Sequence, residues 1–129
     1  GVLLRNRYLE FICKNVFVKL DNKDNSYFKN LDKDIFEFHI AHNEGNYFCT
    51  RDQLKEIEDN NQIAIFYCNK EGQIEDQFNP NGSIKNIAGI FNKEKNVLGM
   101  MPHPERMIDE SLSGEDGSLF FKNLINNIK

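Results

Sequence analysis

Tryptophan is absent from this sequence of 129 residues, and cysteine and proline are scarce, with three residues of each. Three cysteines at irregular spacing do not form the even-numbered framework of a disulfide-stapled secreted protein. No apolar run approaches the roughly 20 residues that cross a bilayer, and no charged and then apolar leader opens the sequence. We therefore expect a cytoplasmic protein with free thiols and no membrane partner.

An excess of positive charge is also missing, because 16 Lys and Arg residues stand against 20 Asp and Glu residues, for a net charge of −4. A dedicated nucleic-acid binder normally shows a basic patch, so we expect no nucleic-acid partner. With 40% hydrophobic and 28% charged residues, the composition is that of a globular domain. A chain of this length is enough for one domain or part of one.

Alternation of apolar and polar residues predicts strands at several places along the chain. The expected strands cover residues 8–20, 34–41, 62–68, 84–91 and 97–101. In the second of them, Phe36 and Phe38 share one face, and His39 is expected to be half-exposed on the other. Residues 70–73 fit a hairpin connection, and the Asn-Pro-Asn-Gly-Ser stretch at residues 79–83 fits a turn.

Two helices are expected. Thr50 followed three residues later by Gln53 is a capping-box pattern, which predicts a short helix through about residue 58. Phe120, Leu124 and Ile128 recur at fourfold spacing and predict a closing helix from about residue 116. Five or six strands with one substantial helix are unbalanced for an α/β domain, which normally covers both faces of its sheet. Either the fold is α+β or an N-terminal half is missing.

The most informative short pattern is Pro102-His103-Pro104-Glu105. Each proline restricts its own φ and keeps the preceding residue out of the helical region, so we expect an extended segment. An extended chain directs residues i and i+2 to the same side. His103 and Glu105 would then be the base and the orienting carboxylate of a nucleophile-activating triad. The same residues also fit a rigid loop in which the two side chains are merely exposed.

No recognisable nucleophile accompanies this pair. A reactive thiol usually lies on a sharp turn or at a helix N-terminus, with glycine neighbours. Cys13 and Cys68 lie within or at the end of expected strands, and we expect both to be small buried apolar residues. Cys49 precedes a helix N-terminus and is a weak candidate. Ser83 and Ser113 fall in expected turns.

A metal site is not expected either. The three histidines and the three cysteines show no C-x-x-C or H-E-x-x-H spacing. His103 and Glu105 could donate two ligands, but no recognisable pattern supplies the others.

Four ordered motifs nevertheless look familiar. They are Gly1-Val2-Leu3-Leu4-Arg5-Asn6, Ile40-Ala41-His42-Asn43-Glu44-Gly45-Asn46-Tyr47, Asn79-Pro80-Asn81-Gly82-Ser83 with Ile87-Ala88-Gly89-Ile90, and Val97-Leu98-Gly99-Met100-Met101-Pro102-His103-Pro104-Glu105-Arg106. Together they resemble the glutaminase subunits of phosphoribosylformylglycinamidine synthases, a family of class I, triad-type glutamine amidotransferases of purine biosynthesis. The likeness runs along essentially the whole chain.

The resemblance implies an α/β fold of the flavodoxin-like or Rossmann-like kind. Residues 1–129 would be the C-terminal portion of a type 1 glutamine amidotransferase domain, strand-rich because its N-terminal half is absent. A Cys-His-Glu triad is implied, in which His103 matches the general base and Glu105 the residue that orients it. The family's cysteine lies on a strand-to-helix elbow upstream of the Leu-Leu-Arg-Asn motif, so no residue of this sequence matches it.

The resemblance also implies a substrate-binding segment, in which His42, Gly45 and Tyr47 help to bind glutamine. Asn43 stands where the family commonly has Gly. The residues alone also fit a strand-end turn with Gly45 at positive φ.

The implied reaction is hydrolysis of glutamine to glutamate and ammonia. The ammonia would pass to a large synthetase subunit, which with a small accessory subunit uses ATP to amidate formylglycinamide ribonucleotide. ATP and Mg²⁺ are expected on that synthetase partner, and no cofactor is expected on this chain. Without the elbow cysteine, we expect the chain alone to be inactive. A non-catalytic docking module and a decayed fragment remain alternatives. A sheet cut through its middle would expose apolar surface, so we expect burial against a partner or a second copy.

Overall fold

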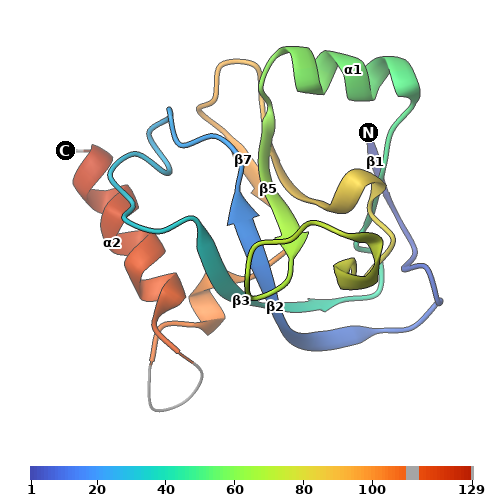
Figure 1. Cartoon of the computed structure of the whole chain (residues 1–129), viewed down its shortest axis with the longest axis horizontal. Coiled ribbons are helices and arrows are strands. Elements are labelled where there is room, and N and C mark those ends of the chain that lie inside the picture. Colours follow the sequence, from blue (N-terminus) through green and yellow to red (C-terminus); the bar gives the residue numbers. More distant parts are fainter. Residues whose placement is uncertain (110–113, 129) are drawn as a thin grey trace.

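The computed structural model describes residues 1–109 and 114–128. The strands are β1 (Val2–Leu4), β2 (Ile12–Leu20), β3 (Ile35–His42), β4 (Asn46–Phe48), β5 (Ile63–Cys68), β6 (Ile87–Phe91) and β7 (Leu98–Met100). The α-helices are α1 (Arg51–Asp59) and α2 (Asp116–Ile128), and short 3₁₀ turns cover Asp76–Phe78, Ile84–Asn86 and Pro104–Arg106. Figure 1 shows the two α-helices on opposite sides of the strands.

Five strands form one sheet in the order β3-β2-β5-β6-β7, while β1 and β4 form a separate two-stranded ribbon. In the described residues every strand pair is antiparallel. The β2–β3 hairpin has the longest register and runs from Ile12 opposite His42 to Lys19 opposite Ile35. Its alternation is as expected from the sequence, because Phe36 and Phe38 are buried.

One hydrophobic core lies between the buried face of this hairpin and helix α2. Phe120 of α2 contacts Phe38 edge-on, with ring centroids 6.0 Å apart, and also packs against Phe28. Buried aromatic pairs of this geometry add to the stabilisation from area burial alone. The closing helix is therefore confirmed, with Phe120 buried and Leu124 half-buried, while the Ile128 side chain lies outside the described part.

Helix α1 packs on a second core at the other face of β5. Thr50 caps the helix, because its side chain accepts a hydrogen bond from the Gln53 N–H and the Gln53 side chain accepts one from the Thr50 N–H. The predicted capping box is thus confirmed. Leu54 and Ile57 are the buried residues of the helix and pack with Ile63 and other apolar residues of the sheet.

Three local predictions, two of strand boundaries and one of a hairpin connection, are wrong. Residues 8–11 form a turn, with Leu9 at φ 57°, and the strand begins only at Ile12. Residues 84–86 form a 3₁₀ turn because the Asn86 amide donates to the carbonyls of Tyr67 and Glu75, which holds Asn86 in a left-handed conformation. Residues 70–73 do form a tight turn but not a hairpin, since a loop rather than a strand follows.

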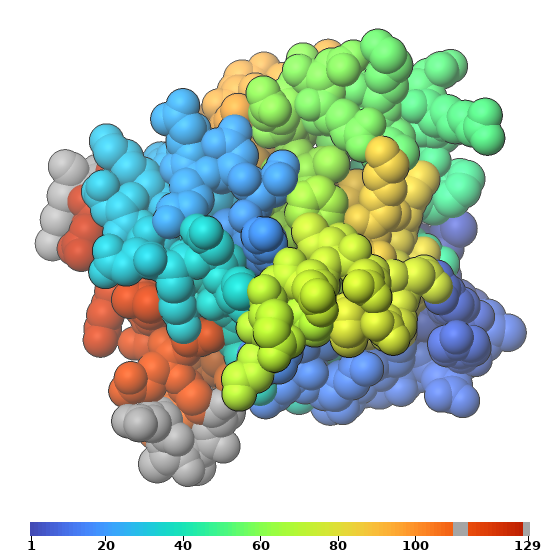
Figure 2. All heavy atoms as spheres, viewed as in Figure 1, coloured from blue at the N-terminus to red at the C-terminus, as the bar shows by residue number. Residues whose placement is uncertain are grey.

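That loop packs back onto the N-terminal segment. The Arg7 N–H donates to the Asn81 carbonyl at 3.0 Å, and the Arg7 guanidinium pairs with both carboxylate oxygens of Asp76. Figure 2 shows residues 69–83, in yellow-green, lying against the blue N-terminal segment. These contacts tie the loop of residues 69–83 to the N-terminal segment.

Candidate active site

His103 and Glu105 form the contact that the proline spacing predicts. The Nδ1 atom of His103 lies 2.6 Å from Oε1 of Glu105. The expected extended segment is found only in part, because His103 is extended but Pro104 begins a 3₁₀ turn that includes Glu105. The His103 N–H donates to the His39 carbonyl at 2.7 Å, so the segment is tied to the edge of β3.

The electrostatics of the pair suit a base and its orienter. Burial disfavours the charged form of Glu105, but hydrogen bonds from its own backbone and from His103 outweigh this and leave its pKa below the ordinary value. An ionised carboxylate can only accept, so Nδ1 of His103 carries the proton and Nε2 of the neutral ring is left as a proton acceptor. Among the described residues, Nε2 has no hydrogen-bond partner.

The N-terminus of α2 clamps the loop that carries this pair. The N–H groups of Gly117 and Ser118 both donate to the carbonyl of Met107, which is itself buried. A Cβ added at Gly117 would lie 1.6 Å from the carbonyl oxygen of Pro104, so glycine is required for this close approach. Asp116 also accepts a hydrogen bond from the Glu37 N–H at 2.6 Å, which links α2 to β3.

His42 is buried and uses both ring nitrogens within the protein. Its Nδ1 lies 3.1 Å from Oδ1 of Asn6, and its Nε2 lies 3.3 Å from Nδ2 of Asn81. Burial of the ring is the largest cause that lowers its pKa. The ring is therefore a neutral Nδ1–H tautomer that holds the loop of residues 42–47 in place. A direct contact with glutamine stays a prediction.

Gly45 is a glycine for a steric reason. Its φ is not positive, so the alternative of a left-handed turn at Gly45 is wrong. A Cβ at this position would lie 2.3 Å from Cε1 of His42, which means that the loop folds directly over the imidazole. The Gly45 N–H donates to Asn6 Oδ1 at 2.9 Å, and its carbonyl accepts from the Ser83 hydroxyl at 3.0 Å.

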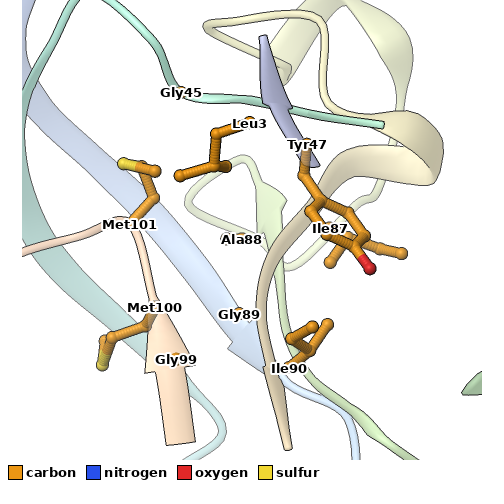
Figure 3. A pocket seen from close by; sticks show the side chains of 10 residues that line it. All are labelled: Leu3, Gly45, Tyr47, Ile87, Ala88, Gly89, Ile90, Gly99, Met100 and Met101. Atoms are coloured by element: carbon orange, nitrogen blue, oxygen red, sulfur yellow. The ribbon is translucent and has the colours of Figure 1, made fainter. Parts of the chain in front are cut away.

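Tyr47 lies at the mouth of an apolar pocket of about 300 Å³. Burial raises the pKa of its hydroxyl, and neighbouring Cys49 adds to the shift. The pocket is lined by Leu3, Gly45, Tyr47, Ile87, Ala88, Gly89, Ile90, Gly99, Met100 and Met101 (Figure 3). The lining includes Gly45 and Tyr47 of the predicted binding segment and Met101, which lies two residues before His103 in the sequence.

Sequence reasoning gave the polar residues beneath this segment no role in holding it. Asn6, Asn81 and Ser83 are 1%, 0% and 3% exposed, and they connect the first, second and third motifs. Asn81 Nδ2 also donates to the hydroxyl of Tyr67 at 3.1 Å. The Asn-Pro-Asn-Gly-Ser stretch predicts a turn. A turn pattern alone does not indicate that the polar side chains of the turn are buried.

The three cysteines are separate from the His103 pair. Cys68 is buried, as expected, and burial raises the pKa of its thiol to about 11. Cys49 is buried in the second core. The expectation for Cys13 is wrong, because it lies on the uncovered face of β2 and is exposed. His39 is half-exposed, as expected.

Within residues 1–109 and 114–128, no group of three or more His, Cys, Asp or Glu side chains is placed to hold a metal ion. In the same residues, no helix has the length and apolar character needed to cross a membrane. Ser113, which the sequence places in a turn, lies outside the described residues.

Known proteins resemble this chain along its length. Residues 2–115 match the CobB/CobQ-like glutamine amidotransferase domain. The chain is 76% identical over 129 residues to the phosphoribosylformylglycinamidine synthase subunit PurQ of Pelagibacter ubique (strain HTCC1062), covering 100% of this chain and 57% of that protein. It is 40% identical over 126 residues to the subunit of the same name from Aquifex aeolicus (strain VF5), covering 97% and 56%.

A solved structure shows the same architecture. The structure of PurLQS from Thermotoga maritima matches with a TM-score of 0.79 at 33% identity, over 100% of this chain and 53% of the matched chain. The expected α/β fold class is confirmed by this likeness. The chain spans about half the length of the curated relatives it matches.

Proposed function

The chain belongs to the CobB/CobQ-like glutamine amidotransferase family, and on that premise we propose that it is the base-carrying portion of a phosphoribosylformylglycinamidine synthase glutaminase subunit. The observation that carries the proposal is the His103–Glu105 contact of 2.6 Å, two residues along the chain from Met101, which lines the apolar pocket with Gly45 and Tyr47. A base with an ionised orienter beside a substrate-sized hollow is the arrangement that nucleophilic amide hydrolysis needs.

In the proposed reaction, Nε2 of His103 takes the proton of a cysteine thiol as the sulfur attacks the glutamine carboxamide. The imidazolium that forms is stabilised by the Glu105 carboxylate on Nδ1. The same Nε2–H then protonates the leaving nitrogen, so ammonia departs and a glutamyl thioester remains. Water, activated by the neutral ring, hydrolyses the thioester to glutamate.

The attacking cysteine does not come from these 129 residues. Cys49 and Cys68 are buried, and the thiol of Cys13 faces His39 instead of His103. The relatives are nearly twice as long as this chain, which supports a nucleophile and an oxyanion-binding loop in the remaining part of the domain. By this proposal the chain alone releases no ammonia from glutamine.

The proposed binding segment is the loop of residues 42–47. Its backbone is fixed by the His42 and Asn6 hydrogen bonds, so it meets glutamine without further ordering. Gly45 and Tyr47 line the pocket and can contact the aliphatic part of glutamine, while the Tyr47 hydroxyl offers a polar contact. His42 supports this segment because Gly45 packs directly against its ring.

The proposed partners follow from the relatives. The matched structure from Thermotoga maritima is that of PurLQS, which supports a large synthetase subunit like PurL and a small accessory subunit like PurS as partners of this chain. ATP and Mg²⁺ would act on the synthetase partner. A cytoplasmic location is supported by three free cysteines.

The test is reconstitution. The 129-residue chain is fused to the portion of the Pelagibacter ubique relative outside the matched region, and glutamate release from glutamine is measured. We expect activity from the fusion, none from the chain alone, and loss of at least about a hundredfold in His103→Ala, in line with the contribution of general base catalysis. Glu105→Gln should retain binding of glutamine but lower kcat.

Two outcomes contradict the proposal. Glutamate release by the chain alone, abolished by His103→Ala, would mean that its own residues provide the nucleophile. A well-folded fusion that binds glutamine but releases no glutamate would favour a non-catalytic docking module. Circular dichroism of each variant separates these outcomes from failure to fold.

A further inference from the structure

A second pairing of a nucleophile with a base lies on the uncovered face of the β2–β3 hairpin. The Sγ atom of Cys13 is 3.3 Å from Nε2 of His39, and Nδ1 of His39 is 2.9 Å from Oδ1 of Asn15. Asn15 is directly opposite His39 in the strand register, and Cys13 is the diagonal neighbour. The proposed glutaminase reaction uses none of these side chains.

The hydrogen bonds define which nitrogen of His39 carries the proton. Nδ2 of Asn15 donates to Oε1 of Glu37 at 3.3 Å, and a carboxylate can only accept, so the Asn15 carbonyl oxygen faces His39. His39 therefore donates from Nδ1, and the lone pair of Nε2 faces the thiol. This is the polarity that a cysteine–histidine–asparagine arrangement requires for proton transfer from sulfur to the ring.

Cys13 is also accessible. Cys49 and Cys68 are buried, whereas Cys13 is exposed and lines an open, largely polar hollow of about 520 Å³. Lys14 lines the same hollow beside Glu10 and the Arg7–Asp76 ion pair, and it offers a cation to a carboxylate-bearing molecule. A small peptide-like disulfide, with its carboxylates and its sulfur–sulfur bond, has the chemistry that fits these groups.

We propose that Cys13 is a reactive thiol that forms mixed disulfides with small peptide-like disulfides of the glutathione type, with His39 as its general base. The Cys13 sulfur attacks one sulfur of the disulfide while Nε2 of His39 takes the thiol proton. The new bond joins Sγ to that sulfur, the old sulfur–sulfur bond breaks, and the leaving thiolate takes the proton from His39. Cys13 is oxidised and the departing half of the disulfide is reduced, so electrons balance.

The test measures mixed-disulfide formation on the purified chain with oxidised glutathione near pH 7, followed by intact mass and peptide mapping. We expect one glutathionyl group, located on Cys13, and none in Cys13→Ser. The rate in His39→Gln should fall about tenfold, below the usual range for general base catalysis because the thiol is exposed to water. Lys122→Gln, an exposed substitution on α2, is the control and should react like the wild type.

A pH profile separates a base from a merely structural histidine. Free thiols ionise near pH 8.5, so the ratio of the wild-type rate to the His39→Gln rate should be largest near neutrality and approach one above about pH 9.5. Asn15→Leu should lower the neutral rate in the same way, because His39 loses the acceptor that fixes its tautomer. Equal rates for wild type and His39→Gln at pH 7, or labelling mainly on Cys49 or Cys68, would overturn the proposal.

Discussion

The carboxylate of Glu105 holds the His103 ring in one orientation through its 2.6 Å contact with Nδ1. Pro102 and Pro104 restrict the backbone locally, so the approach of His103 to Glu105 could be predicted from four consecutive residues. The buried network around His42 could not, because it depends on Asn6 and Asn81, which lie far apart in the sequence. Only the folded chain brings such partners together.

Gly45→Ala tests the steric role of that glycine. The added methyl group would lie 2.3 Å from the His42 ring, so the ring or the loop must move, and we expect a loss of about 2 kcal/mol in the free energy of unfolding. Urea denaturation measures this loss in the free energy of unfolding. Gly99→Ala is the matched control, since its nearest non-neighbouring atom is 4.0 Å away, and it should change stability by less than about 0.5 kcal/mol. Equal effects of the two substitutions would contradict the steric explanation.

His42 predicts a pH dependence of stability. Its folded-state pKa is depressed, chiefly by burial, so the unfolded chain binds a proton more readily than the folded one. The stabilisation is complete above the unfolded value of about 6.5 and is lost as pH falls through the lower folded value. Urea unfolding at about pH 7.5 and pH 5.5 should show weaker stability at the lower pH, by the linkage of protonation to unfolding. His42→Gln should reduce that difference, and an unchanged slope in this variant would assign the dependence to other groups.

Among the elements, helices were easier to predict than the segments between strands. The α1 cap depends on Thr50 and Gln53, three residues apart, so the sequence contains the whole signal. The 3₁₀ turn at residues 84–86 depends on carbonyls of Tyr67 and Glu75, which a local pattern does not include. Tertiary hydrogen bonds thus override a run of apolar residues that predicts a strand.

The junction of α2 with the loop that carries His103 and Glu105 gives a prediction at the scale of the elements. Gly117→Ala would place a methyl group 1.6 Å from the Pro104 carbonyl oxygen, so α2 must shift away from the loop. We expect a loss of about 2 kcal/mol of stability, and in the reconstituted fusion a larger fall in kcat than in glutamine affinity. Ser118→Ala keeps the backbone hydrogen bond to Met107 and serves as the control. An active Gly117→Ala fusion would show that the loop holds its geometry without α2.

At the scale of the whole molecule, the strand content and the α/β class could be predicted, but the strand order could not. The order β3-β2-β5-β6-β7 depends on which edges meet in space, and residues 69–86 separate β5 from its neighbour β6 without any regular strand. The sequence predicts α1 as a short helix, but it does not predict that α1 and α2 lie on opposite sides of the sheet.

At the scale of the whole molecule, we predict that exposed apolar surface is buried by association between chains. Val2, Leu3 and Leu4 are 55%, 52% and 44% exposed, and Leu3 borders the apolar pocket. We expect the isolated chain to associate with a second copy, which sedimentation velocity would detect as a concentration-dependent shift. Leu3→Lys should weaken the association about tenfold or more, whereas Lys122→Gln should not. A monomer at all concentrations would contradict it.

The contact between α2 and the loop that carries His103 and Glu105 has a consequence for the time course of synthesis. A ribosome makes a chain from its N-terminal side onward, so His103 and Glu105 leave it before residues 116–128. Until that last helix is released, Gly117 cannot close against Pro104 and the loop lacks its support. The loop of His103 and Glu105 therefore gains the support of α2 only after translation has passed this helix.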